Sequence, residues 1–158
     1  MSQLFVRVIG GNEIRRDIAD LPCIFSTNGT YYPLPILKQR ADRFNRARCF
    51  IHHTADRSLN AVLLGWVDEV FFSEQDSSLL GVIECVGQTE YTLASAFAGV
   101  WGISWQGATT QVPYKKTGHI VVIDIDAVKT IDVVQKPAAG GAFLSEAEFN
   151  YLRGDNQK

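Results

Sequence analysis

His119-Ile120-Val121-Val122-Ile123-Asp124-Ile125 carries the clearest strand pattern in the sequence, since five of its seven residues are β-branched. Ala127–Val134 follows it as a second expected strand. Upstream, Val100–Ser104 is a third apolar run, and it ends in a serine flanked by glycines. The other expected strands are Leu4–Ile9, Glu13–Ile18, Cys23–Phe25, Cys49–Ile51, Ala61–Phe72 and Leu79–Val86. The chain is therefore expected to consist mainly of β-strands.

Turn and helix signals separate these strands. Gly10 and Gly11 predict a hairpin between the first two of them, Leu4–Ile9 and Glu13–Ile18. The expected helices are an amphipathic one over Leu34–Ala47, a short one over Thr89–Ala98, and a terminal one that Ser145 and Glu148 begin as a capping box.

The order of elements is not a repeating β-α-β, which argues against a doubly wound parallel sheet. The predicted fold class is α+β, mainly β, in the form of a closed or nearly closed β-barrel decorated by two or three helices. Residues 1–153 are expected to form a single domain, and residues 154–158 a frayed C-terminal tail.

Composition narrows the classes of partner. The chain has 158 residues and a formal net charge of −2, which gives no electrostatic reason to expect nucleic acid or an anionic membrane. No run of about 18 apolar residues occurs, so a soluble cytoplasmic protein is expected. Cys23, Cys49 and Cys85 are odd in number and widely spaced, and they are expected to be buried thiols in a reducing compartment.

Ser104 is the candidate nucleophile. A serine hydroxyl needs an adjacent base at neutral pH, and imidazole has a suitable pKa. The sequence holds three histidines, His52, His53 and His119, which lie on both sides of Ser104. Since adjacent residues of a strand point to opposite faces, at most one of His52 and His53 is expected to reach Ser104.

The base also needs a group that orients it. His119 and the carboxylates of Asp124, Asp126 and Asp132 are candidates for that role. A hydrogen-bonded structural histidine and a solvated acidic face explain the same residues equally well, so a structural interpretation stays open.

Residues Gly107–Gly118 are expected to form an irregular loop, long enough to be functional. Gly107, Lys115 and Lys116 are its candidates for binding an oxyanion. A metal site on the three histidines is the weaker alternative, because two adjacent histidines of a strand diverge and no cluster of ligands lies nearby. No metal is therefore expected.

Several motifs follow one another in a familiar order. They are Asn28-Gly29-Thr30-Tyr31-Tyr32-Pro33 before a helix, Phe50-Ile51-His52-His53, Leu64-Gly65-Trp66-Val67-Asp68-Glu69-Val70, Trp101-Gly102-Ile103-Ser104, and Ile131-Asp132-Val133-Val134-Gln135-Lys136-Pro137-Ala138-Ala139-Gly140-Gly141-Ala142. In these motifs the chain resembles the capsid-maturation (prohead) serine proteases of tailed bacteriophages, which share the fold of the herpesvirus maturation proteases. The resemblance spans roughly residues 25 to 143.

The resemblance implies roles for individual residues. By position, Ser104 corresponds to the nucleophile and His53 to the base, with His52 as the alternative base. His119 is the expected third member, because the herpesvirus enzymes use a second histidine there. Asp124 and Asp132 remain the alternatives for that third position.

The implied function is that of a serine endopeptidase without a cofactor. Its substrates would be segments of the phage scaffold protein and the major capsid protein, cleaved inside the assembling prohead in the host cytoplasm. Both a monomer and a homo-oligomer are compatible with the motifs. The alternative from another class is a catalytically inactive barrel that acts as a structural or scaffold-binding phage protein.

Overall fold

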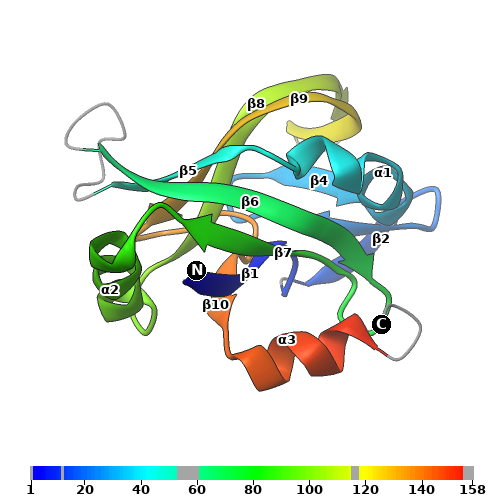
Figure 1. Cartoon of the computed structure of the whole chain (residues 1–158). Coiled ribbons are helices and arrows are strands. Elements are labelled where there is room, and N and C mark those ends of the chain that lie inside the picture. Colours follow the sequence, from blue (N-terminus) through cyan, green and yellow to red (C-terminus); the bar gives the residue numbers. More distant parts are fainter. Residues whose placement is uncertain (1, 12, 53–60, 115–117, 155–158) are drawn as a thin grey trace.

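A computed structural model describes residues 2–11, 13–52, 61–114 and 118–154. Within them, a curled ten-stranded sheet carries three α-helices and one 3-10 helix (Figure 1). The strands are β1 (Gln3–Ile9), β2 (Ile14–Ile18), β3 (Leu21–Phe25), β4 (Thr30–Pro33), β5 (Arg48–His52), β6 (Ala61–Ser73), β7 (Ser78–Cys85), β8 (Gly102–Tyr114), β9 (His119–Val134) and β10 (Ala142–Leu144). The helices are α1 (Leu34–Arg40), the 3-10 helix η1 (Ala41–Phe44), α2 (Gln88–Phe97) and α3 (Glu146–Arg153).

Strand β9 connects the two halves of the sheet. Its start pairs with β4 and its end with β5, both in parallel, while β8 pairs antiparallel with it along almost its whole length. The two strands predicted over His119–Ile125 and Ala127–Val134 are therefore one strand. The loop predicted over Gly107–Gly118 is wrong for the same reason, because Gly107 to Tyr114 continue β8 in the β8–β9 ladder.

The fold is mainly β, as predicted, but its sheet does not form a closed barrel. The strands follow the order β10-β1-β7-β6-β5-β9-β4-β3-β2, and β10 and β2 do not pair with each other. One isolated bridge joins Ile103 to Gly141, and within the described residues no continuous ladder closes the sheet there. The molecule is a strongly curled, open half-barrel with helices attached.

The core lies on the concave side of the curled sheet. It gathers fully buried side chains from nearly every strand, among them Val6, Ile51, Ile83, Ile103 and Val133. The alternation of side chains along each strand turns the intervening residues to the other face of the sheet. That outer face carries the polar residues discussed below.

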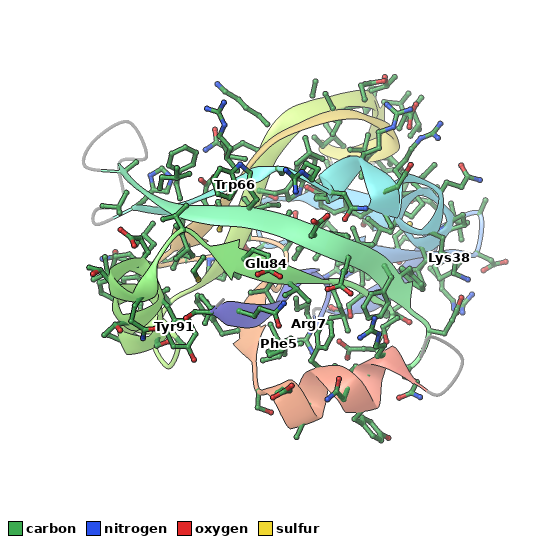
Figure 2. All side chains as sticks on the ribbon, viewed as in Figure 1. Phe5, Arg7, Lys38, Trp66, Glu84 and Tyr91 are labelled. Atoms are coloured by element: carbon green, nitrogen blue, oxygen red, sulfur yellow. The ribbon has the colours of Figure 1, made fainter. Side chains whose placement is uncertain are left out.

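Helix α3 covers a separate patch of the sheet. Ser145 accepts a hydrogen bond from the Glu148 backbone N–H at 3.1 Å, so the predicted cap is confirmed. Phe149 lies 4.9 Å from the ring of Phe5, which points from β1 toward the helix (Figure 2). Burying Phe149 against β1 fixes this helix to the sheet.

Two local predictions are wrong. Ile14–Ile18 pairs with β3, not with β1, because Gly10 and Gly11 carry the chain away from β1 and the Gly10 N–H bonds to the Ala139 carbonyl. The helix predicted over Leu34–Ala47 leaves α geometry after Arg40 and ends as a 3-10 turn. None of the helices in the described part of the chain is long and apolar enough to cross a bilayer.

The three cysteines are buried free thiols, as expected. Burial raises the pKa of Cys23 and of Cys85 to about 11, and it holds the pKa of Cys49 well above the usual range. Thiolate is the reactive form, so these thiols are poor nucleophiles at neutral pH.

Candidate functional site

Three neighbouring strands bring the candidate residues to one place on the outer face. Asp132 of β9 lies opposite Phe50 of β5 on one side and opposite Ser104 of β8 on the other. Residues that pair directly in a sheet point to the same face. Ile51 follows Phe50 on β5, Ile103 precedes Ser104 on β8, and both isoleucines are buried in the core. Because neighbouring residues of a strand point to opposite faces, Asp132 and Ser104 point outward.

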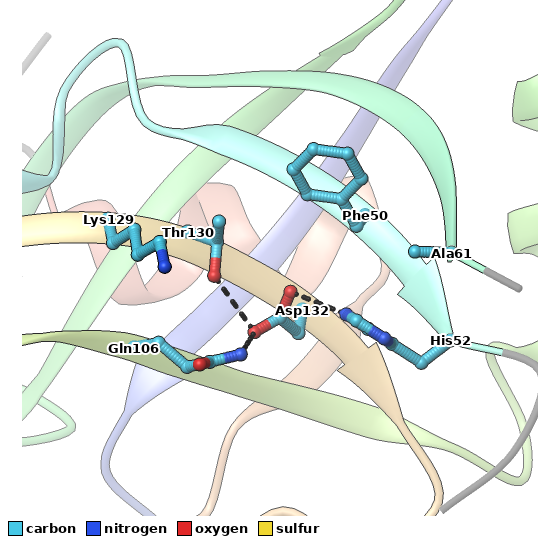
Figure 3. A pocket seen from close by; sticks show the side chains of 7 residues that line it. All are labelled: Phe50, His52, Ala61, Gln106, Lys129, Thr130 and Asp132. Carbon is cyan, nitrogen blue, oxygen red and sulfur yellow. Dashed lines mark hydrogen bonds and ion pairs between the residues drawn. The ribbon is translucent and has the colours of Figure 1, made fainter. Parts of the chain in front are cut away.

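Asp132 is the centre of a hydrogen-bonded cluster. Its Oδ1 lies 2.8 Å from Nε2 of His52, and its Oδ2 accepts hydrogen bonds from Gln106 Nε2 and Thr130 Oγ1, each at 3.0 Å (Figure 3). Asp132 is 0% exposed and His52 4% exposed. An aspartate buried this completely is stable only when its oxygens are hydrogen-bonded, and here both are.

This bonding pattern determines the tautomer of His52. Because Asp132 already accepts two hydrogen bonds at Oδ2, it acts as a carboxylate acceptor, and we assign the His52 proton to Nε2. In the neutral ring, Nδ1 then carries the lone pair. Nδ1 is buried and has no hydrogen-bond partner among the described residues. The ring is therefore arranged as a base that a carboxylate holds in position.

A cavity of about 440 Å³ opens beside this pair. Its lining residues are Phe50, His52, Ala61, Gln106, Lys129, Thr130 and Asp132, all drawn in Figure 3. Ser104 is half-buried and precedes Gln106 by two positions, on the same face of β8. The hydroxyl, the imidazole and the carboxylate thus come from β8, β5 and β9 and share one face at one end of the sheet.

The structure places two of the predicted alternatives side by side. His52, the alternative base, is the histidine bonded to the carboxylate, and Asp132, an alternative third member, is that carboxylate. His53, the first choice for the base, lies outside the described residues. Ser104 lies next to Asp132, one strand away.

His119 does not belong to this cluster. It pairs with Tyr114 at the far end of the β8–β9 ladder, 13 positions from Asp132 along β9 and hence at roughly 40 Å of strand length. Its ring packs 5.1 Å from Phe25 and 6.1 Å from Tyr31. The structure therefore does not bring His119 to Ser104, because the two lie at opposite ends of the β8–β9 ladder.

The other predicted carboxylates also lie elsewhere. Asp124 pairs with Arg40 at 2.6 Å, and this hydrogen bond lowers the pKa of Asp124. Asp126 accepts a hydrogen bond from Thr110. Both residues belong to the middle of β9, away from Ser104, so neither orients a base for it.

The predicted oxyanion residues are not confirmed in that role. Gly107 is part of the continuous strand β8, opposite Val128, and not of a loop. Lys115 and Lys116 lie outside the described residues. Among the residues that are described, no group of three or more histidine, cysteine or acidic side chains is arranged to hold a metal ion. His52, on β5, lies beside Asp132 near the end of β9, whereas His119 lies at the start of β9, so the structure does not bring these two histidines together around one metal ion.

Sequence reasoning missed Gln106 and Thr130. Each lies two positions from a predicted site residue, Ser104 or Asp132, and so shares its face. Alternation along each strand therefore indicated that Gln106 and Thr130 share a face with Ser104 and Asp132. The register between β8 and β9 was needed to show that the four residues meet. Searches of protein-family models, of curated proteins and of solved structures found no match to this chain.

Proposed function

We propose that this protein is a serine endopeptidase in which Ser104 is the nucleophile, His52 the general base and Asp132 the group that orients the base. One observation carries the proposal: a buried His52–Asp132 hydrogen bond of 2.8 Å lies on the same outer face as Ser104, which pairs directly with Asp132. A hydroxyl, an imidazole and a carboxylate together form the constellation of serine hydrolases.

The reaction follows from these three groups. Nδ1 of His52 takes the proton of Ser104 while Oγ attacks the scissile carbonyl carbon, and the positive ring is stabilised by Asp132. The ring then gives that proton to the leaving amine as the C–N bond breaks, which leaves an ester on Ser104. Water, deprotonated by the same nitrogen, hydrolyses the ester and regenerates the serine.

Gln106 and Thr130 support the orienting group. Their hydrogen bonds to Oδ2 fix the carboxylate, so that Oδ1 stays directed at His52. Because Asp132 is fully buried, its attraction for a protonated ring is stronger than it would be in water. Gln106 and Thr130 are therefore positioning residues.

The proposed substrates come from the resemblance to prohead proteases. The motif Asp132-Val133-Val134 with Pro137 is its most specific part, and it contains the carboxylate of the cluster. We therefore propose segments of the phage scaffold and major capsid proteins as substrates, cleaved within the assembling head. The position of the cluster on the outer face, beside an open cavity, is compatible with a polypeptide substrate.

The test is covalent labelling combined with cleavage. The full chain is treated with a fluorophosphonate, the labelled peptide is identified by mass spectrometry, and cleavage of co-expressed scaffold protein is followed in parallel. Stoichiometric labelling at Ser104, with loss of both labelling and cleavage in Ser104→Ala, is expected. The matched control is Ser95→Ala, on the exposed side of α2, which should retain both.

A well-folded protein with no labelling and no cleavage would contradict the proposal. In that case the buried cluster would be a polar anchor between β5, β8 and β9, and the non-catalytic, scaffold-binding alternative would replace the enzyme.

A further inference from the structure

The cavity beside His52 continues into a second hollow on the same face. This second hollow, of about 500 Å³, shares Phe50, Lys129 and Thr130 with the first. Its other lining residues include Arg48, the first residue of β5, and Arg46, two positions before it. We call the two adjoining hollows the basic groove.

The groove carries unbalanced positive charge. Arg48 and Lys129 are exposed, and neither forms an ion pair with a described residue. Arg46 has a long contact of 3.5 Å with Asp68. The one acidic side chain among the described lining residues is Asp132, whose two oxygens already accept hydrogen bonds. An anionic group entering the groove therefore meets two cations, Arg48 and Lys129, that form no ion pair within the described part of the chain.

A β-bulge directs Lys129 into the groove. Gln106 pairs with Thr130 and Gly107 pairs with Val128, so Lys129 is the extra residue on β9 and has no partner on β8. Such a residue is turned away from strict alternation. Figure 3 shows its side chain on the same side of β9 as Thr130 and Gln106. A side chain at Gly107 would collide with the Ala127 carbonyl oxygen, so this glycine permits the bulge.

The free edge of β8 suits an extended peptide. Apart from the Ile103–Gly141 bridge, the described residues offer no pairing partner to the side of β8 that faces away from β9. An unpaired strand edge can bind an extended chain through its backbone N–H and C=O groups. Since Gln106 of β8 also lines the groove, a chain lying on this edge would run alongside the groove.

We propose that the basic groove binds an acidic segment of an extended polypeptide, with Arg48 and Lys129 holding its Asp or Glu carboxylates. This inference rests on the proposed endopeptidase function and names its substrate class: the protein should cleave beside acidic side chains. The cations lie along the same two strands as the base and the orienting carboxylate. A carboxylate bound there would sit within a few residues of the scissile bond.

Binding is measured with Ser104→Ala protein, which cannot turn the ligand over. The probes are two fluorescent alanine-based peptides that differ only in having several glutamates or the same number of glutamines. By fluorescence anisotropy at low ionic strength, the glutamate peptide should bind about tenfold more tightly, as expected for charge-assisted contacts. The preference should shrink in high salt.

Variants locate the contact. In the Ser104→Ala background, Lys129→Gln and Arg48→Gln should each reduce the preference, and the double variant should abolish it. Lys129→Arg keeps the charge and should restore binding, which separates recognition from misfolding. Arg16→Gln, which removes the same charge from β2 at the far edge of the sheet, is the control and should change nothing.

Equal affinity for the two peptides would overturn the inference. So would tighter binding of a short single-stranded oligonucleotide of the same net charge, since the groove would then recognise any polyanion. Fluorophosphonate labelling of Ser104 is read separately. Labelling without acidic preference removes the substrate class and leaves the hydrolase, whereas acidic preference without labelling leaves the groove and removes the proposed chemistry.

Discussion

A histidine lies near each end of β9, in contrasting surroundings. At one end His52, on the neighbouring strand, bonds to the buried carboxylate of Asp132 and faces a cavity. At the other end His119 packs among the rings of Phe25 and Tyr31. A position near a strand end is common to both histidines, whereas a carboxylate that can orient the ring as a base is seen beside His52.

Replacing each histidine gives the largest expected contrast. His52→Ala should reduce the rate of peptide cleavage by about 10⁴-fold, because Ser104 loses its base. His119→Ala should leave that rate within about twofold, since His119 lies at the far end of the ladder. Kinetics on a cleaved scaffold peptide, with circular dichroism of both variants, makes the comparison. Equal losses in the two variants would contradict it.

The carboxylates of β9 give the next contrast, in stability. Asp132→Ala leaves the buried donors of His52, Gln106 and Thr130 without their acceptor and should cost about 3 kcal/mol. Asp124→Ala removes a partly exposed ion pair that solvent screens, and it should cost much less than Asp132→Ala. Urea unfolding of the two variants measures both values. A cost at Asp124 as large as that at Asp132 would mean that burial does not distinguish the two carboxylates.

Much of the fold at the Asp132 end was predictable, and the pairing of β8 was not. The apolar runs of β5 and β9 and the histidine that ends β5 stand out in the sequence. The mostly exposed segment from Gly107 to Tyr114 resembles a loop in the sequence, because polar and apolar residues do not alternate along it. They form a strand because β9 supplies a continuous ladder beside them, which starts with Tyr114 opposite His119, and their own sequence does not show this pairing.

The site was predictable as a set of residue types, and its members depended on register. Ser104 and the histidines follow from chemistry, but the choice among Asp124, Asp132 and His119 needed the position of each on β9. The resemblance to herpesvirus enzymes favoured a second histidine, whereas the structure has a carboxylate beside His52. The closed barrel failed for a similar reason: nothing local indicates that β10 and β2 stay apart.

Cys23, the thiol near the His119 end, is expected to have a smaller effect, on the pH dependence of stability. Burial raises the pKa of Cys23, near the His119 end, to about 11 from an ordinary value near 9.0. A raised folded-state pKa stabilises the fold at pH values below the ordinary pKa, and this contribution is lost as the pH rises through about 11. Unfolding free energy should therefore fall between pH 9 and 11 in the native chain, and less so in Cys23→Ala. An identical pH dependence in both would contradict the assignment.

A crystal structure of the protein after reaction with a peptidyl phosphonate would show the proposed catalytic groups directly. We expect a bond between phosphorus and Ser104 Oγ, with Nδ1 of His52 within about 3 Å of Oγ or of the bound phosphonate oxygen and Nε2 still on Asp132. An unmodified Ser104, or an adduct in which another group replaces His52 at the serine, would contradict it.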